Sequence, residues 1–262
     1  NGNGATFASW NWKAGTSFTN DASGTGIGSI DSAGSFNNDS GFSIVSYTGT
    51  GSNGTLKHGL NSTPSTIIVK ERGGDGNWIV YHSTLGNGKY LSLTDTGAAV
   101  TASNYWNNTS PTSSVFTVGT TGNVNGSSKT YIAYCFADIQ GYSKVGGSYV
   151  GNGNADGTFV YTGFKPAFVM IKATSTAKDW KIIDNKRNPS GLGGANPVRY
   201  RLAANTTATT SDDGDGQDFT SQGFKFKTTD SHMNGNGTTY MYMAFAENPF
   251  VTGSSAIPTT AR

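Results

Sequence analysis

The three histidines are the side chains best suited to acid–base or metal chemistry, but their spacing supports neither. His58, His82 and His232 lie far apart, with no pair at the spacing that places two imidazoles on one metal ion. His82 is matched by Asp184 when the two halves of the chain are aligned as described below. If both halves do the same job, that job does not require an imidazole.

The sequence contains equally few residues that indicate nucleophilic or carboxylate catalysis. The chain has no Gly-X-Ser-X-Gly pentapeptide, which in many hydrolases presents a serine on a strand-to-helix turn. Glutamate occurs only as Glu71 and Glu247, and we expect both at or beyond strand ends. Spacing along the chain does not decide whether two carboxylates meet in space, so glycosidase chemistry stays open as an alternative. Because domains without a catalytic motif more often bind than react, we expect a protein that is not an enzyme.

The densest acidic cluster comprises Asp212, Asp213, Asp215 and Asp218, separated by glycines and one glutamine. Oxygen ligands on a turn-rich segment are typical of calcium loops, so these four residues are the metal-site candidates. The segment lacks the twelve-residue EF-hand order and its closing glutamate, and Asp-Gly pairs are common in plain turns. A solvated loop is therefore the alternative, and we expect no cofactor other than a calcium ion at this cluster.

An aromatic pair flanked by amides, Tyr105, Trp106, Asn107 and Asn108, is the candidate ligand-binding site. A flat ring can stack on a sugar while the amides bind its hydroxyls. The same residues can also form a plug that packs across the end of a sandwich, and both interpretations stay open. Trp78 and Trp180 differ, because they recur at the same repeat position within a strand, which favours burial in the core.

Composition indicates a folded, turn-rich β protein. Glycine accounts for 37 of 262 residues, charged residues for only 13% and aromatic residues for 12%. Few charges and many small polar residues disfavour helices, while the aromatic content is too high for a disordered segment. The lone Cys135 lies in an apolar run without a basic neighbour, so we expect a small buried hydrophobe.

Charge and hydropathy exclude two classes of partner. The net charge is +2, from 18 basic and 16 acidic residues scattered along the chain, so the basic stripe that nucleic-acid binding needs is missing. No segment approaches 18 consecutive apolar residues, and we expect no membrane insertion.

The chain contains an internal repeat of roughly domain length. The stretch 47–137 aligns with the stretch 149–246, so that Tyr47 matches Tyr149, the run 67–70 matches 169–172, and Trp78 matches Trp180. A period of about a hundred residues is far longer than a solenoid unit, so we expect two tandem domains. Short glycine-punctuated runs with alternating residues predict strands, for example at 42–47, 65–70, 78–82, 167–172 and 180–184.

The predicted fold class is all-β, with two tandem antiparallel β-sandwich domains. The first spans residues 41–139, the second residues 141–250, and a tail follows at 251–262. The short join at residues 139–142 predicts that the two domains pack closely.

Residues 1–40 are predicted to be the last strand of an upstream module plus a connector. The phrase at residues 1–12, a Gly/Asn turn followed by an aromatic run, is repeated at 234–245 and more loosely at 125–136. Because the other two copies close a repeat, the first copy predicts a module upstream of it. Residues 14–40 are rich in Gly, Ser, Asn and Asp and predict a connector with at most a short hairpin near residues 27–30.

Several runs together resemble tandem modules near the C-termini of tail-fibre and related structural proteins of bacteriophages, especially marine ones. They are Gly41-Phe-Ser-Ile-Val-Ser-Tyr-Thr-Gly-Thr-Gly51, Trp78-Ile-Val-Tyr-His82, Tyr240-Met-Tyr-Met-Ala-Phe-Ala-Glu-Asn-Pro-Phe250 and Thr259-Thr-Ala-Arg262. Ala5-Thr-Phe-Ala-Ser-Trp-Asn-Trp-Lys-Ala14 is similar to the join that follows a laminin-G-like β-sandwich in such proteins. The family has no catalytic signature to carry over.

The resemblance implies an exposed tail fibre or appendage of the virion, hence an extracellular location. It implies bacterial surface polysaccharide or another receptor as ligand, other virion tail proteins as partners, and assembly as a homotrimer. Three functions follow in order: receptor binding or adhesion, a purely structural or decorating role, and a tailspike depolymerase.

Overall fold

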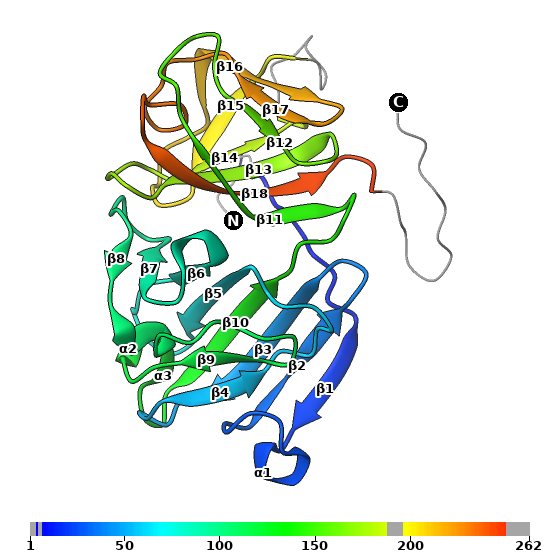
Figure 1. The fold of residues 1–262 in the computed structure, drawn as a ribbon, viewed down its shortest axis with the longest axis vertical. Coiled ribbons are helices and arrows are strands. Elements are labelled where there is room, and N and C mark those ends of the chain that lie inside the picture. Colours follow the sequence, from blue (N-terminus) through cyan, green and yellow to red (C-terminus); the bar gives the residue numbers. More distant parts are fainter. Residues whose placement is uncertain (1–3, 5–6, 188–195, 250–262) are drawn as a thin grey trace.

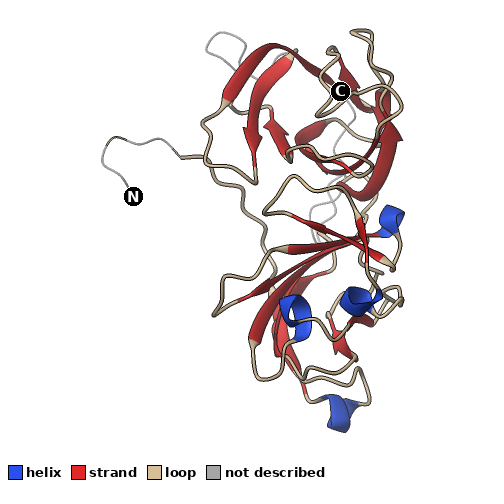
Figure 2. Cartoon of the chain, turned by 90° about the vertical axis from the view of Figure 1, so that its left-hand side faces the viewer, coloured by secondary structure: helices blue, strands red, loops and turns tan. Residues whose placement is uncertain are grey.

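The computed structural model describes residues 4, 7–187 and 196–249, with the backbone alone at residues 213–215. The fold is all-β, as predicted, and its strands form two modules stacked along the long axis of the molecule (Figures 1 and 2). No helix in the described part of the chain is long and apolar enough to cross a membrane.

The first module has a large antiparallel sheet, a small sheet and short helices. The large sheet runs in the order β1 (Thr16–Asn20), β2 (Ser32–Asn37), β3 (Phe42–Thr48), β10 (Thr130–Phe136), β5 (Thr66–Glu71), β6 (Ile79–His82), β7 (Lys89–Ser92) and β8 (Val100–Thr101). The small sheet pairs β4 (Gly54–Lys57) with β9 (Val115–Val118). The helices are α1 (Ala22–Thr25), η1 (Ser83–Leu85), α2 (Ser103–Trp106) and α3 (Gly122–Asn125). A core that includes Val45, Leu56 and Phe116 lies between the two sheets.

The second module has one continuous antiparallel sheet. Its order is β11 (Ser143–Val150), β18 (Thr239–Ala246), β13 (Pro166–Ala173), β14 (Lys181–Asp184), β15 (Val198–Ala203), β16 (Ser211–Thr220), β17 (Gly223–Phe226) and β12 (Phe159–Tyr161). Its core joins the two ends of this order, because Val169 and Ile171 of β13 share one cluster with Val160 and Phe224.

The internal repeat is visible in the strand order. The order β3-β10-β5-β6-β7 of the first module recurs as β11-β18-β13-β14-β15 in the second. The pair β4-β9 recurs as β12-β17, which β16 links to the rest of the sheet in the second module. Side chains alternate between the two faces of β6, since Ile79 and Tyr81 lie in the inner core whereas Val80 packs on the opposite face.

Residues 14–40 are part of the first sheet, so the predicted connector was wrong. β1 pairs with β2, and β2 pairs with β3 along its whole length. The sequence concealed these strands because their residues are mostly small. Gly34 shows why one of them must be glycine: a Cβ there would lie 2.0 Å from the carbonyl oxygen of Ile44.

The predicted strand at the N-terminus was also wrong where it is described, because residues 7–15 form no strand. Trp12 instead inserts between the modules, with its ring 5.9 Å from that of Phe136 and 5.3 Å from that of Phe245. Trp10 and Trp12 alternate along the chain as the residues of a strand do. The alternation arises because this segment packs against both modules, not because it is a strand. Residues 1–3 and 5–6 of the repeated phrase, and the predicted tail at 251–262, lie outside the described residues.

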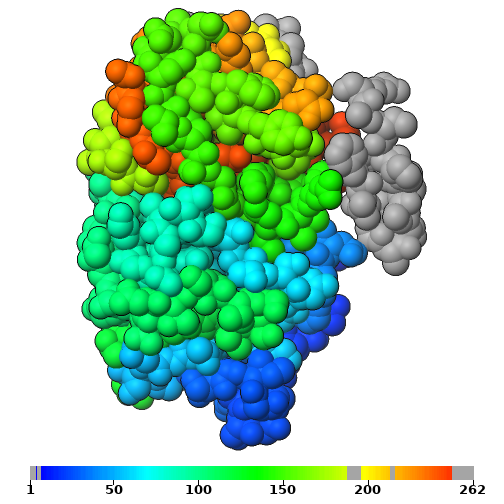
Figure 3. Space-filling view, viewed as in Figure 1, coloured from blue at the N-terminus to red at the C-terminus, as the bar shows by residue number. Residues whose placement is uncertain are grey.

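The two modules pack back to back, as the short join predicted. The outer faces of their large sheets share a cluster, which we call the seam. Its buried members are Ala14, Phe42, Ile68, Val80, Leu91, Phe136, Val145, Phe168, Met170, Trp180, Ile182, Met241, Met243 and Phe245. On the face shown in Figure 3, the modules meet along a continuous boundary. The seam therefore joins the two modules through a continuous apolar core.

Polar contacts also cross the seam. The Trp180 indole Nε1 donates a hydrogen bond to the Ser92 carbonyl oxygen at 2.9 Å. The fully buried Lys172 Nζ donates to the carbonyl oxygen of Thr96 at 3.1 Å. Its repeat counterpart, Lys70, donates within its own module, to the Gly74 carbonyl oxygen at 2.7 Å. Both modules therefore have a lysine at this position that binds a loop, but in the second module the bound loop lies across the seam.

Each module contains the same buried group of two tyrosines and one asparagine, which we call the latch. In the first module the rings of Tyr47 and Tyr131 stack with centroids 5.2 Å apart. The Asn125 amide nitrogen donates to the carbonyl oxygens of Ser52 and Gly119, and its Oδ1 accepts from Thr50 N.

The second latch has the same geometry. Tyr149 and Tyr240 stack at 5.0 Å, and each of the four latch tyrosines donates its hydroxyl hydrogen to a backbone carbonyl oxygen. Asn234 holds the carbonyl oxygens of Asn154 and Thr228. The repeated Asn-Gly phrase is therefore structural in both modules.

Candidate functional site

Two histidines act as turn caps. His58 Nδ1 accepts a hydrogen bond from Leu60 N at 3.1 Å, and Thr162 makes the equivalent contact to Phe164 N in the second module. His82 Nδ1 accepts from Thr84 N, as Asp184 Oδ1 does from Lys186 N. The first module has His82 where the second has Asp184 because the turn that follows needs only a hydrogen-bond acceptor at this position.

We expect stability to fall as the pH drops from 6.5 toward 4. Burial lowers the pKa of both His58 and His82 to about 4, below the ordinary value of 6.5. Between these values the unfolded chain binds protons that the folded chain does not, so the free energy of unfolding decreases with falling pH. The effect is roughly 3 kcal/mol per histidine. Urea unfolding at pH 7 and pH 4.5 measures it.

His58→Thr and His82→Asn provide the control, because each keeps an acceptor for the turn without a titrating ring. Each should remove about half of the pH dependence. An unchanged difference between the two pH values in the double variant would show that other groups are responsible.

The acidic cluster lies entirely within a strand, β16, so the predicted loop was wrong. β16 is paired on both sides, Asp212 accepts from Arg199 Nε at 2.9 Å, and Asp218 lies 3.6 Å from Lys227 Nζ. The side chains of Asp213 and Asp215 lie outside the described part of the structure. Among the described residues, no three His, Cys, Asp or Glu side chains are grouped to hold a metal ion.

Tyr105 and Trp106 occupy the core of the first module. Trp106 is 1% exposed, and its Nε1 donates to the carbonyl oxygen of Lys89 at 3.0 Å. Tyr105 stacks on Tyr90 with ring centroids 3.7 Å apart. Asn107 and Asn108 are exposed and left-handed, with φ of 50° and 48°. Because both rings are covered, these residues form the plug that was the alternative to a sugar-binding site. Neither ring can stack on a sugar.

Other residues singled out in the sequence are also structural. Cys135 is fully buried, and burial raises the pKa of its thiol to about 12, so it is an inert apolar side chain. Trp180 is fully buried, as expected, whereas Trp78 is half-buried and stacks on Tyr134. Glu71 and Glu247 lie in different modules and form ion pairs with Lys129 and Lys165.

The structure reveals one charged cluster that sequence spacing does not show. Asp230 accepts from the buried Arg201 at 2.9 Å and from His232 Nδ1 at 2.9 Å, while His232 Nε2 lies 3.5 Å from Asp179. Burial alone would raise the pKa of Asp230, but hydrogen bonds from His232 and the charges of His232 and Arg201 hold it at about 2. Asp230 and His232 are two residues apart, whereas Asp179 and Arg201 come from other segments, so only the fold brings the four together.

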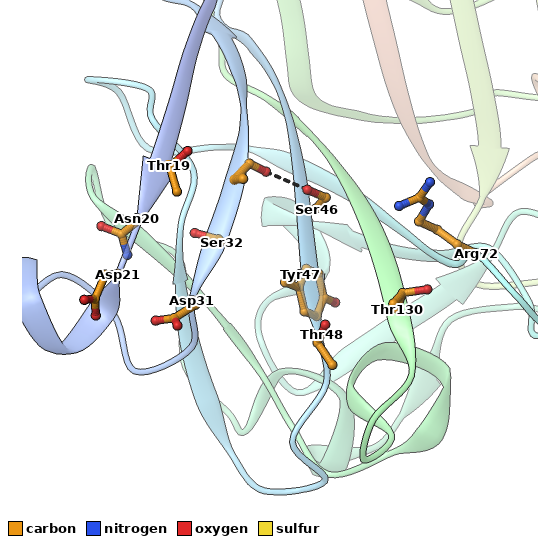
Figure 4. Close-up of a pocket in the computed structure, with 11 residues that line it drawn as sticks. Thr19, Asn20, Asp21, Asp31, Ser32, Ser46, Tyr47, Thr48, Arg72 and Thr130 are labelled. Carbon is orange, nitrogen blue, oxygen red and sulfur yellow. Dashed lines mark hydrogen bonds between the residues drawn. The ribbon is translucent and has the colours of Figure 1, made fainter.

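A polar hollow of about 360 Å³ lies on the outer face of the first sheet, below the seam (Figure 4). β1, β2, β3 and β10 supply its floor, because small residues there leave the sheet uncovered. Figure 4 shows Asp21 and Asp31 at one end, Arg72 at the other, and Ser46, Thr48 and Thr130 between them. A larger hollow of about 870 Å³ lies between the N-terminal residues 7–10 and the second module, where Asp184, Arg187 and Tyr200 line it. Another, of about 450 Å³, is lined mainly by seam residues and belongs to the packing between the modules.

The hollow keeps unused hydrogen-bonding capacity. The exposed side chains of Thr48, Arg72 and Thr130 make no hydrogen bond within the described part of the chain. Asp31 accepts from Ala22 N at 2.8 Å through one oxygen, and Ser46 donates to the Ala33 carbonyl oxygen. Hydroxyls, a carboxylate and a guanidinium on a rigid sheet can hold a ligand rich in hydroxyl groups.

Comparisons with known proteins identify a family. Residues 1–249 match the model of a domain of unknown function, DUF7483. No curated protein and no solved structure matches the chain. The single family match spans both modules and the N-terminal segment that packs between them. The chain belongs to the DUF7483 family.

Proposed function

We propose that this protein is a non-enzymatic component of a bacteriophage tail fibre that attaches to polysaccharide on the bacterial surface. The polar hollow carries the proposal, because Thr48, Arg72 and Thr130 present hydroxyl and guanidinium groups there that the described part of the fold does not use. The resemblance of the repeat motifs to tail-fibre modules supplies the setting: exposed on the virion, homotrimeric, and joined to other tail proteins.

The scaffold suits this role physically. The floor strands of the hollow are paired along their length, β1 with β2, β2 with β3 and β3 with β10, so little conformational entropy is lost when a ligand binds. A sheet of small polar residues presents closely spaced donors and acceptors, which match the spacing of hydroxyls on a sugar ring.

We expect the purified chain to bind bacterial envelope polysaccharide on a glycan array, and Arg72→Ala to weaken that binding at least tenfold. A guanidinium hydrogen bond contributes about 1.5–3 kcal/mol, which corresponds to a factor of ten or more. Thr130→Val should weaken binding less. Thr101→Val, at an exposed threonine of β8, is the matched control. Equal binding by all three variants would exclude the hollow.

The seam favours a second candidate, a purely structural or decorating virion protein. Most of the large aromatic side chains outside the module cores lie in or against the seam and join the modules. A spacer in a fibre would require such a firm contact between its modules. Absence of binding to any envelope polysaccharide, together with antibody labelling along the shaft of the fibre, would favour this candidate.

A further inference from the structure

Two exposed aromatic side chains lie side by side on β12 of the second module. Tyr161 is 66% exposed and Phe159 is 47% exposed, whereas Val160 between them is 5% exposed. Because strand residues alternate, both rings point away from the core, with Cα atoms about 7 Å apart. The only other aromatic side chain exposed to this degree among the described residues is Phe7.

The scaffold does not require these rings, as the repeat shows. β4 is the counterpart of β12, and Leu56 faces Phe116 as Val160 faces Phe224. The positions of Phe159 and Tyr161 are therefore held by Thr55 and Lys57 in the first module. There the carbonyl oxygen of Thr55 accepts hydrogen bonds from Ser29 N and Ile30 N, so a loop covers that edge.

Glycines keep the space beside Tyr161 open. Its cross-strand partner is Gly223, which has no side chain to cover the ring. The Tyr161 hydroxyl lies 3.6 Å from where a Cβ of Gly163 would stand. The exposed turn between β16 and β17 places the Gln222 backbone next to the end of β12, where its carbonyl oxygen accepts from Thr162 N.

The charges around the rings are balanced. Lys225, the cross-strand partner of Phe159, lies 2.5 Å from Asp156, and Lys227 lies 3.6 Å from Asp218. A surface with paired charges does not select an anionic ligand. Flat exposed rings, one of which carries the Tyr161 hydroxyl, instead suit an uncharged ligand with apolar faces and polar edges, which is the chemistry of a pyranose.

We infer that the outer face of β12 is a carbohydrate subsite in which Phe159 and Tyr161 stack on neutral sugar rings. This inference rests on the proposed function and adds to it a second site, in the other module, with a preference for uncharged glycan. It also explains why the two repeats differ at these positions while their cores agree.

Affinity electrophoresis of the full chain tests the subsite, with gels that contain dextran, mannan or galactan as neutral probes and alginate as the anionic probe. We expect at least one neutral polysaccharide to retard the protein. Tyr161→Ala and Phe159→Ala should each weaken this retardation at least tenfold, and Tyr161→Trp should preserve it. Because both residues are exposed, circular dichroism should show unchanged folding.

Thr55→Ala and Lys57→Ala are the matched controls in the first module and should leave retardation unchanged. The inference is overturned if the Phe159/Tyr161 double variant binds as the unsubstituted protein does, if alginate alone retards the protein, or if no neutral probe does. A change in oligomeric state by light scattering without a change in retardation would instead assign the rings to self-association. If Arg72→Ala abolishes binding and Tyr161→Ala does not, the proposed function survives and this subsite does not.

Discussion

Replacing Trp180 with alanine is expected to lower the free energy of unfolding by about 3–5 kcal/mol. The indole is fully buried in the seam, and its Nε1 donates to Ser92 of the other module. The truncation leaves a cavity between two rigid sheets that cannot close around it, and it leaves the Ser92 carbonyl oxygen without this donor. Urea unfolding followed by far-ultraviolet circular dichroism measures the loss.

The same experiment tests whether the modules depend on each other. With the seam weakened, the two modules should unfold in separate transitions, whereas the unsubstituted protein should show one. Trp78→Ala is the matched control, because Trp78 holds the same repeat position but is only half-buried at the edge of the seam, with its ring stacked on Tyr134 of its own module. Equal losses for the two variants would show that burial in the seam is not what stabilises the pair.

Much of the fold could be predicted because the strands that build the inner cores carry β-branched and aromatic residues in a period-two pattern. The segments 42–47 and 167–172 fall within β3 and β13 for this reason. The internal repeat also helped the prediction, because Trp78 and Trp180 could be compared as residues at the same position of two related modules.

The strands of small residues could not be predicted in the same way. β2 reads Ser-Ala-Gly-Ser-Phe-Asn, in which Gly34 reflects the close approach of the Ile44 backbone and not a turn. β16 contains all four clustered aspartates within its first eight residues, and its strand form comes from its two sheet neighbours, which local sequence does not reveal.

The site was harder to predict than the fold, because the strongest local signals were structural. Trp106 stood out as an aromatic residue flanked by amides, but its indole nitrogen is needed to satisfy Lys89 inside the core. The exposed rings of Phe159 and Tyr161 have no unusual sequence context. Only the comparison of β12 with β4 shows that one module has exposed aromatics where the other has Thr55 and Lys57.

Replacing Asn234 with aspartate is expected to cost about 3 kcal/mol or more of stability at pH 7, although the two side chains have nearly the same shape. The buried amide nitrogen donates to the carbonyl oxygens of Asn154 and Thr228 and to Asn152 Oδ1. A carboxylate would turn these three attractions into repulsions and would bury a charge. Asn236→Asp, at an exposed position two residues later, is the matched control and should cost less than about 0.5 kcal/mol.

The pH dependence of this variant gives a sharper test of the latch. Burial and the facing oxygens should raise the folded-state pKa of the new carboxyl above its unfolded value, so the destabilisation relative to the unsubstituted protein should shrink as the pH falls toward 4 and grow as it rises. Asn125→Asp should behave in the same way in the first module, because Asn125 makes the corresponding contacts to Ser52 and Gly119. A loss that grows toward acid pH, or one no larger than that of Asn236→Asp, would mean that the amide does not hold the loops together.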